Sequence, residues 1–137
     1  MTPLAIPGTL AALVATATVL GLLWKAQNGR ARKASGAVSP TDVGAVLGTT
    51  ATLLQFSSEI CAYCPGTRRV LSEAATGGVS HIELDIVAHR GLVERFNILQ
   101  TPTTLILDHK GDVKARIGGA VRPDTLSAEL DRVLAAA

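Results

Sequence analysis

The two cysteines of the chain lie three residues apart, as Cys61-Ala62-Tyr63-Cys64, and no other cysteine occurs in the 137 residues. One helical turn brings positions i and i+3 onto the same face, so this spacing suits a redox-active dithiol or half of a metal site. A thiol attacks as the thiolate, and a free cysteine with a pKa of about 8.5 is only slightly ionised at pH 7. The reactivity of the pair therefore depends on the elements that position it.

A metal site is the first alternative for the cysteines. Structural zinc takes four protein ligands, so the pair would need two more. The three histidines, His81, His89 and His109, do not form a recognised ligand spacing with the pair. We therefore expect no metal and no other cofactor.

The residues around the pair predict a strand followed by a helix. Residues 50–57 are apolar and β-branched, with the length of a buried strand. Between residues 61 and 76 apolar side chains recur at steps of three and four, which predicts an amphipathic helix. A thiol at a helix N-terminus meets unsatisfied N–H groups and the positive end of the helix dipole, which lower its pKa. Cys61 is therefore the predicted nucleophile, and Cys64, one turn further on, the predicted resolving thiol.

The rest of the chain completes an α/β domain. The patterns predict a short helix over 41–47, a strand over 79–85, a helix over 88–96, strands over 103–107 and 113–117 joined by a turn, and a helix over 123–134. A βαβ crossover followed by an antiparallel hairpin gives a mixed central sheet flanked by helices. Residues 40–137 are expected to form this domain.

An uncharged run of 21 residues, from Leu4 to Trp24, precedes the domain. As a helix it would span about 30 Å, the thickness of the hydrocarbon core of a bilayer. A cleaved signal peptide would have a basic segment before the run, and a core helix would carry a polar stripe. We interpret residues 1–24 as an uncleaved, single-pass membrane anchor, in contact with lipid through residues 4–24, and residues 25–39 as a basic juxtamembrane linker.

Charge predicts the orientation of the anchor. Lys25, Arg30, Arg32 and Lys33 follow the apolar run directly, and no basic side chain precedes it. The positive-inside rule then predicts a cytoplasmic domain and an outer N-terminus, with an extracytoplasmic domain as the alternative. The remainder of the chain holds nine basic and eleven acidic residues and few aromatic ones, so nucleic acid is not an expected partner.

With a strand before the pair, a helix after it, and Thr101-Pro102 ahead of the hairpin, the chain resembles the thioredoxin family from about residue 41 onward. Further landmarks of the resemblance are Phe56, Asp85, residues 96–103, residues 110–113 and residues 118–119. The resemblance implies a thioredoxin-like fold and thiol–disulfide oxidoreductase activity on protein disulfides, with an unidentified redox partner. It also implies that Pro102 is cis and faces the dithiol, and that Thr101 and Pro102 contact the substrate.

The chain departs from typical thioredoxins at three places. Ile60 stands where they carry Trp, Ala62-Tyr63 replaces Gly-Pro, and Gln55 occupies the place of a buried acid. Glutamine cannot take up a proton, so deprotonation of Cys64 would rely on water, Glu59 or the substrate. A redox-inactive binding module could accept these changes and is the alternative to an enzyme. The architecture is similar to that of membrane-anchored thioredoxin-like proteins of bacteria, some of which work outside the cytoplasm in oxidative folding or cytochrome maturation.

Overall fold

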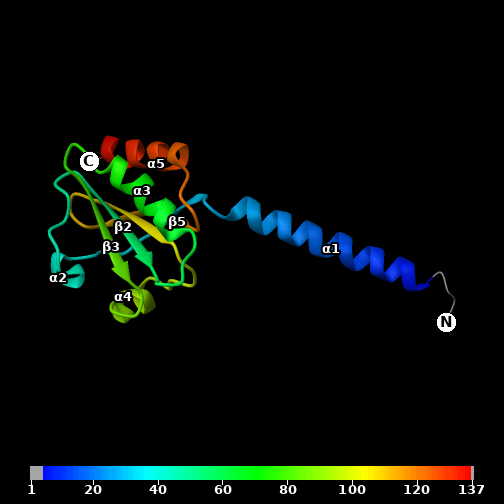
Figure 1. The fold of residues 1–137 in the computed structure, drawn as a ribbon. Coiled ribbons are helices and arrows are strands. Elements are labelled where there is room, and N and C mark those ends of the chain that lie inside the picture. Colours follow the sequence, from blue (N-terminus) through cyan, green and yellow to red (C-terminus); the bar gives the residue numbers. More distant parts are fainter. Residues whose placement is uncertain (1–4, 137) are drawn as a thin grey trace.

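A computed structural model describes residues 5–136, in which one long helix leads into a domain built on a single sheet (Figure 1). Residues 1–4 of the expected anchor and residue 137 of the expected domain lie outside the described part. The long helix, α1, spans Ala5–Gln27. It projects away from the domain, which contains all the strands (Figure 1).

The sheet has five strands in the order β1-β5-β4-β2-β3. They are β1 (Ala31–Lys33), β2 (Ala51–Ser57), β3 (Val79–Asp85), β4 (Thr103–Asp108) and β5 (Val113–Gly118). β2 and β3 run parallel, and the other neighbouring pairs run antiparallel. Parallel neighbours need a crossover connection, which here is the helix α3 (Cys64–Ala74). The predicted mixed sheet is confirmed.

Helices cover both faces of the sheet (Figure 1). On one face α3 and α5 (Pro123–Ala135) pack against a core that includes Leu53 and Ile106. On the other face α4 (Arg90–Arg95) and the short α2 (Pro40–Val43) pack against a core that includes Leu54 and Leu105. Successive residues of a strand point to opposite faces, so β2, which is buried along its whole length, supplies both cores.

Several predicted boundaries need correction. The helix expected to start at residue 61 starts at Cys64, because Pro65 suits the first turn, where its missing N–H has no partner to lose. The helix expected over 41–47 ends at Val43, because Gly44 adopts a left-handed conformation (φ +65°) and caps it. The strand over 79–85 has the predicted bounds.

The expected linker is wrong over residues 31–33, which form the edge strand β1. Ala31 pairs with Ile117 and Lys33 with Ala115, both on β5. Two of the three β1 residues are charged and exposed, so no apolar pattern marks the strand. The sheet therefore begins nine residues earlier in the chain than the predicted domain start at residue 40.

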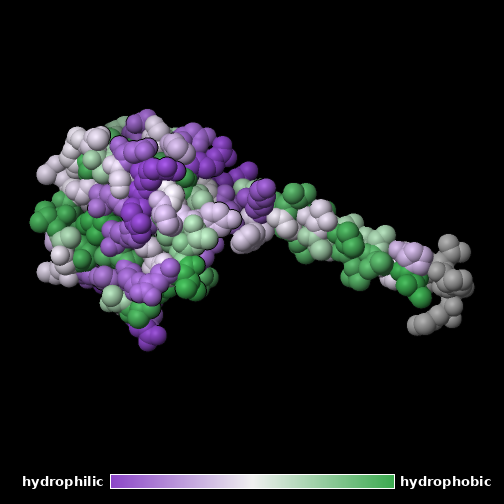
Figure 2. All heavy atoms as spheres, viewed as in Figure 1, coloured by the Kyte–Doolittle hydropathy of each residue, from purple (hydrophilic) through white to green (hydrophobic). Residues whose placement is uncertain are grey.

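The helix α1 is long and apolar enough to cross a bilayer. Between Ile6 and Gln27 it contains an 18-residue window with a mean hydropathy of 1.9, and none of that window is buried in the structure. Length and composition alone do not separate a membrane span from a signal sequence or a core helix. A core helix, however, would be covered by the domain, whereas α1 presents apolar side chains along its exposed length (Figure 2).

Candidate functional site

Cys61 and Cys64 form a disulfide, with their Cα atoms 5.4 Å apart. Cys61 lies in the loop that connects β2 to α3, where its N–H donates to the carbonyl of Ser58 at 3.2 Å. Cys64 is the first residue of α3 and is 2 % exposed, whereas Cys61 is half-buried. The two sulfur-bearing residues therefore differ in access, and Cys61 is the one open to solvent.

The Thr101–Pro102 peptide bond is cis, the isomer that the resemblance implied. Pro102 is buried, and its carbonyl accepts from the N–H of Gly119 at 2.8 Å. The hydroxyl groups of Thr101 and Ser58 share a hydrogen bond of 3.2 Å. Since Ser58 also holds Cys61, this bond places the Thr101–Pro102 loop beside the dithiol loop. The substrate contacts expected of Thr101 and Pro102 stay predictions.

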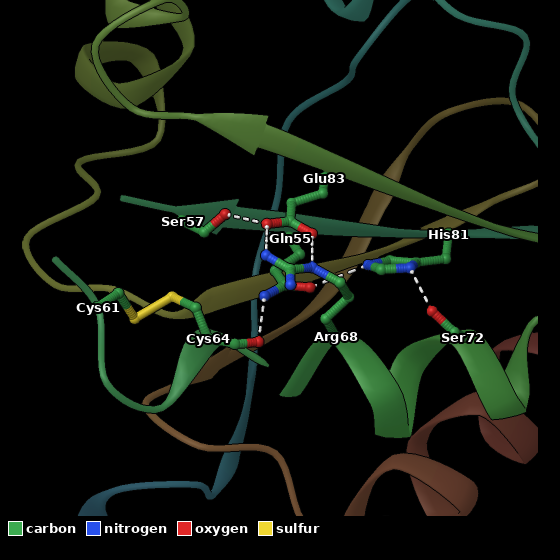
Figure 3. Close-up of polar contacts among 8 residues, drawn as sticks. All are labelled: Gln55, Ser57, Cys61, Cys64, Arg68, Ser72, His81 and Glu83. Carbon is green, nitrogen blue, oxygen red and sulfur yellow. Dashed lines mark hydrogen bonds and ion pairs between the residues drawn. A yellow bond between two sulfur atoms is a disulfide. The ribbon is translucent and has the colours of Figure 1, made fainter. Parts of the chain in front are cut away.

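Gln55 lies behind the cysteines on β2 and is completely buried (Figure 3). Its Nε2 donates to the carbonyl of Cys64 at 3.2 Å, and its Oε1 lies 2.9 Å from Nε2 of His81. A backbone carbonyl only accepts, so the amide nitrogen of Gln55 must face Cys64 and the amide oxygen must face His81. His81 therefore carries a proton on Nε2 and donates it to Gln55.

The other ring nitrogen of His81, Nδ1, lies 3.1 Å from the hydroxyl of Ser72 on α3. Because Ser72 can donate or accept, this bond accommodates both the neutral and the charged ring. Burial lowers the pKa of His81; Glu83 opposes this effect, and Arg68 adds to it. The ring is therefore mainly neutral at pH 7, with its single proton directed at Gln55.

An ion pair flanks this network (Figure 3). Arg68 of α3 donates from two nitrogens to the carboxylate of Glu83, and Ser57 donates to the same carboxylate at 2.7 Å. The hydrogen bond from Arg68 lowers the pKa of Glu83, partial burial opposes the shift, and Ser57 supports it. Glu83 in turn raises the pKa of Arg68. Arg68, an exposed cation on α3, therefore belongs to this cluster.

His81 is a residue of this cluster that the sequence considered only as a metal ligand. The parallel register places Leu53 opposite His81 and Gln55 opposite Glu83. Gln55, His81 and Glu83 therefore lie next to one another on the face that α3 covers. Strand alternation predicts that His81 and Glu83 lie on the same face of the sheet. The same alternation along β2 is the signal in the sequence that could have assigned Gln55 to that face as well. Asp85, by contrast, ends β3 as expected, because it accepts from the N–H groups of Val87 and Ala88.

The described part of the chain contains no cluster of side chains suited to bind a metal ion. Within residues 5–136 no group of three or more His, Cys, Asp or Glu side chains is placed so that it could hold a metal ion. Large apolar side chains are exposed in the dithiol loop and just ahead of the Thr101–Pro102 loop: Ile60 is 95 % exposed, Tyr63 69 % and Leu99 82 %. Such side chains suit contact with a polypeptide.

Among solved structures, the chain is similar to a point mutant of thioredoxin from Halobacterium salinarum NRC-1, with a TM-score of 0.55. The sequences are 16 % identical, and the match covers 63 % of this chain and 76 % of that one. At this identity the similarity shows the fold: the domain has the thioredoxin fold. No protein-family model matches the chain. No curated protein matches it either.

Proposed function

From a thioredoxin fold that carries a close cysteine pair, we propose that the chain is a thiol–disulfide oxidoreductase that acts on protein disulfides. The observation that carries the proposal is the unequal access of the two cysteines, with Cys61 open to solvent and Cys64 buried at the start of α3. Exchange chemistry needs this asymmetry, because one thiol must meet the substrate and the other must wait for the mixed disulfide.

In the reducing direction the thiolate of Cys61 attacks one sulfur of the substrate disulfide. The substrate S–S bond breaks, a Cys61–substrate disulfide forms, and the departing sulfur takes a proton from solvent. The thiolate of Cys64 then attacks the Cys61 sulfur and releases the second substrate thiol. The substrate gains two electrons, the pair ends as the Cys61–Cys64 disulfide, and a partner dithiol must reduce it for the next turnover.

Helix α3 supports the thiolate. Cys61 comes before the first turn, whose N–H groups have no carbonyl partners within the helix, and the positive end of the helix dipole lies at this end. This arrangement favours the ionised form of a nearby thiol. We expect Thr101, Pro102 and the exposed side chains of Ile60 and Leu99 to contact the substrate, because they border the dithiol loop or continue the Thr101–Pro102 loop.

We further propose that residues 4–24 anchor the protein in a membrane with the domain in the cytoplasm. The support for this orientation is the four cations Lys25, Arg30, Arg32 and Lys33, because basic residues next to a span are retained on the cytoplasmic side. The cytoplasm is reducing, so the pair would serve there as a reductant. An extracytoplasmic domain would instead act in disulfide formation.

The test uses the full chain in detergent micelles or lipid nanodiscs, with dithiothreitol as electron source and insulin as substrate. We expect Cys61→Ser to lose activity. In a separate incubation with insulin and without dithiothreitol, we expect reduced Cys64→Ser to accumulate mixed disulfides on Cys61, which dithiothreitol then releases. Equal activity of wild type and Cys61→Ser would refute the oxidoreductase and leave a binding module as the function of the fold.

A further inference from the structure

The connection between α1 and the sheet is short. α1 ends at Gln27 and β1 starts at Ala31, so the Cα atoms of these residues are at most about 14 Å apart. The guanidinium of Arg32 also donates to the side chain of Gln27 at 3.0 Å. The domain is therefore held against the end of α1 and does not hang on a long tether.

A series of contacts then runs from this connection to the Thr101–Pro102 loop. The N–H of Gly29 donates to the carbonyl of Gly118 at 2.7 Å, and the N–H of Gly119 donates to the carbonyl of Pro102 at 2.8 Å. Gly29 is buried with φ +75°, and a Cβ there would come within 2.9 Å of the carbonyl of Ala120. Covalent steps and hydrogen-bond lengths together limit the distance from Gly29 to Pro102 to roughly 17 Å.

The series of contacts ends at the cysteines. The hydroxyl of Thr101 shares a hydrogen bond with the hydroxyl of Ser58, and the carbonyl of Ser58 accepts a hydrogen bond from the N–H of Cys61. In Figure 1 the end of α3 that follows the dithiol loop lies on the side of the domain from which α1 leaves. The apolar run of α1 ends at Trp24, a residue type typical of the membrane interface. The reactive end of the domain is therefore held close to the bilayer surface once α1 spans the membrane.

On the premise of the proposed function, we infer that the substrate is a disulfide in an acidic juxtamembrane segment of a membrane-bound partner. Even fully extended, the path from Trp24 to Pro102 is about 30 Å, which an extended substrate segment of about nine residues matches. A disulfide much further from the bilayer reaches the pair only when its tether folds back.

We infer an acidic substrate segment from a cleft of about 670 Å³ between the end of α1 and the residues that flank the Thr101–Pro102 bond. Its walls include Arg30, Arg32, Lys33, Arg116, Gln100 and Thr103, and no acidic side chain lines it. Hydrophilic residues gather where α1 meets the domain (Figure 2). A segment that runs from the membrane toward Cys61 through this cleft meets four cations, which favour carboxylates.

The experiment places the full chain in phosphatidylcholine vesicles with single-span peptides that carry a disulfide-linked fluorophore. The disulfide lies about nine or about 36 residues from the span, and the local concentration of a flexible tether falls with roughly the −3/2 power of its length. We therefore expect the near disulfide to be reduced about eightfold faster than the far one. We also expect aspartate flanks to give faster reduction than lysine flanks.

A spacer variant, with about 20 Gly and Ser residues inserted after Gln27, lengthens both tethers and should reduce the preference to about threefold. The same insertion placed after residue 137 is the matched control and should keep the eightfold preference. The spacer variant should reduce soluble insulin as fast as wild type, because its domain is unchanged. An Arg30→Ser, Lys33→Ser double variant removes two of the four cations and should weaken the flank preference.

The outcomes separate the two proposals. If wild type reduces insulin but reduces near and far peptides at equal rates, the juxtamembrane substrate is wrong and the oxidoreductase stands. If aspartate and lysine flanks react equally, the acidic segment is wrong, and retention of phosphatidylglycerol by the purified chain would assign the cleft to lipid headgroups. If wild type reduces neither insulin nor peptide, the proposed function fails and this inference fails with it.

Discussion

Replacement of Gln55 by leucine tests whether the buried amide holds the dithiol end of α3 to the sheet. Leucine has a similar size but offers neither a donor to the Cys64 carbonyl nor an acceptor to His81. Both hydrogen bonds are lost in this variant, and the carbonyl of Cys64 and the Nε2–H of His81 remain without these partners.

The magnitude follows from how deeply each orphaned group is buried. Cys64 is 2 % exposed, and a buried carbonyl without a partner costs about 1–3 kcal/mol. His81 is half-buried, so water replaces part of its lost bond, and the buried leucine returns about 1 kcal/mol of apolar transfer energy. We expect a net loss of about 2 kcal/mol in the free energy of unfolding, or about 10 °C in Tm for a domain of this size.

The assay is denaturant unfolding of the oxidised full chain in micelles, followed by circular dichroism. The matched control is Gln100→Leu, because Gln100 is exposed and its replacement should stay within about 0.5 kcal/mol of wild type. A double-mutant cycle with His81→Leu should give a coupling of about 1 kcal/mol between positions 55 and 81. Additive effects of the two replacements would refute the Gln55–His81 bond, and a Gln55→Leu variant as stable as its control would refute the argument from burial.

Three further predictions concern pH, backbone and topology. Because burial lowers the pKa of His81 in the folded chain, the unfolded chain binds more protons below about pH 6.5, so stability should fall as the pH drops below about 6.5. Unfolding curves at several pH values should show that His81→Gln no longer loses stability in this way. The further loss of stability at lower pH should persist in the variant, because the carboxylates of Glu83 and Asp42, whose pKa values are lowered, take up protons there. Gly29→Ala should lower stability by about 1–3 kcal/mol, because its φ of +75° and the nearby Ala120 carbonyl oppose a Cβ; calorimetry measures this loss, and an unchanged Tm would contradict the close approach of α1 to the sheet. An impermeant maleimide should label reduced Cys61 only after cells are permeabilised, and labelling of intact cells would reverse the proposed orientation.

Several elements could be predicted because their signals are local. The strand over 79–85 has alternating side chains after a Gly77-Gly78 stop, and Pro123 marks the start of the last helix. The helix after the cysteines is recognisable by its period, although its first turn was placed three residues too early. Patterns of this kind depend on residues within one or two turns of each other, so one stretch of sequence is enough to reveal them.

β1 could not be predicted in this way. Its three residues carry two exposed charges, and they form a strand because the outer edge of β5 offers unpaired backbone groups. The partner of Gln55 was equally hidden, because residue 81 comes to residue 55 only through the parallel register of β2 and β3. Both features join parts of the chain that are distant in sequence.

The sequence by itself determined the chemistry that the chain carries: one dithiol, a Thr-Pro ahead of a hairpin, and an apolar run with cations after it. Residue type and short-range spacing encode these features directly. Only the tertiary structure decided that His81 and Gln55 lie behind Cys64, that Arg68 pairs with Glu83, and that the end of α1 is tied to the Thr101–Pro102 loop. Those contacts arise when the strands pair and the helices pack, because hydrogen bonding and burial select the register from many arrangements that local preferences allow.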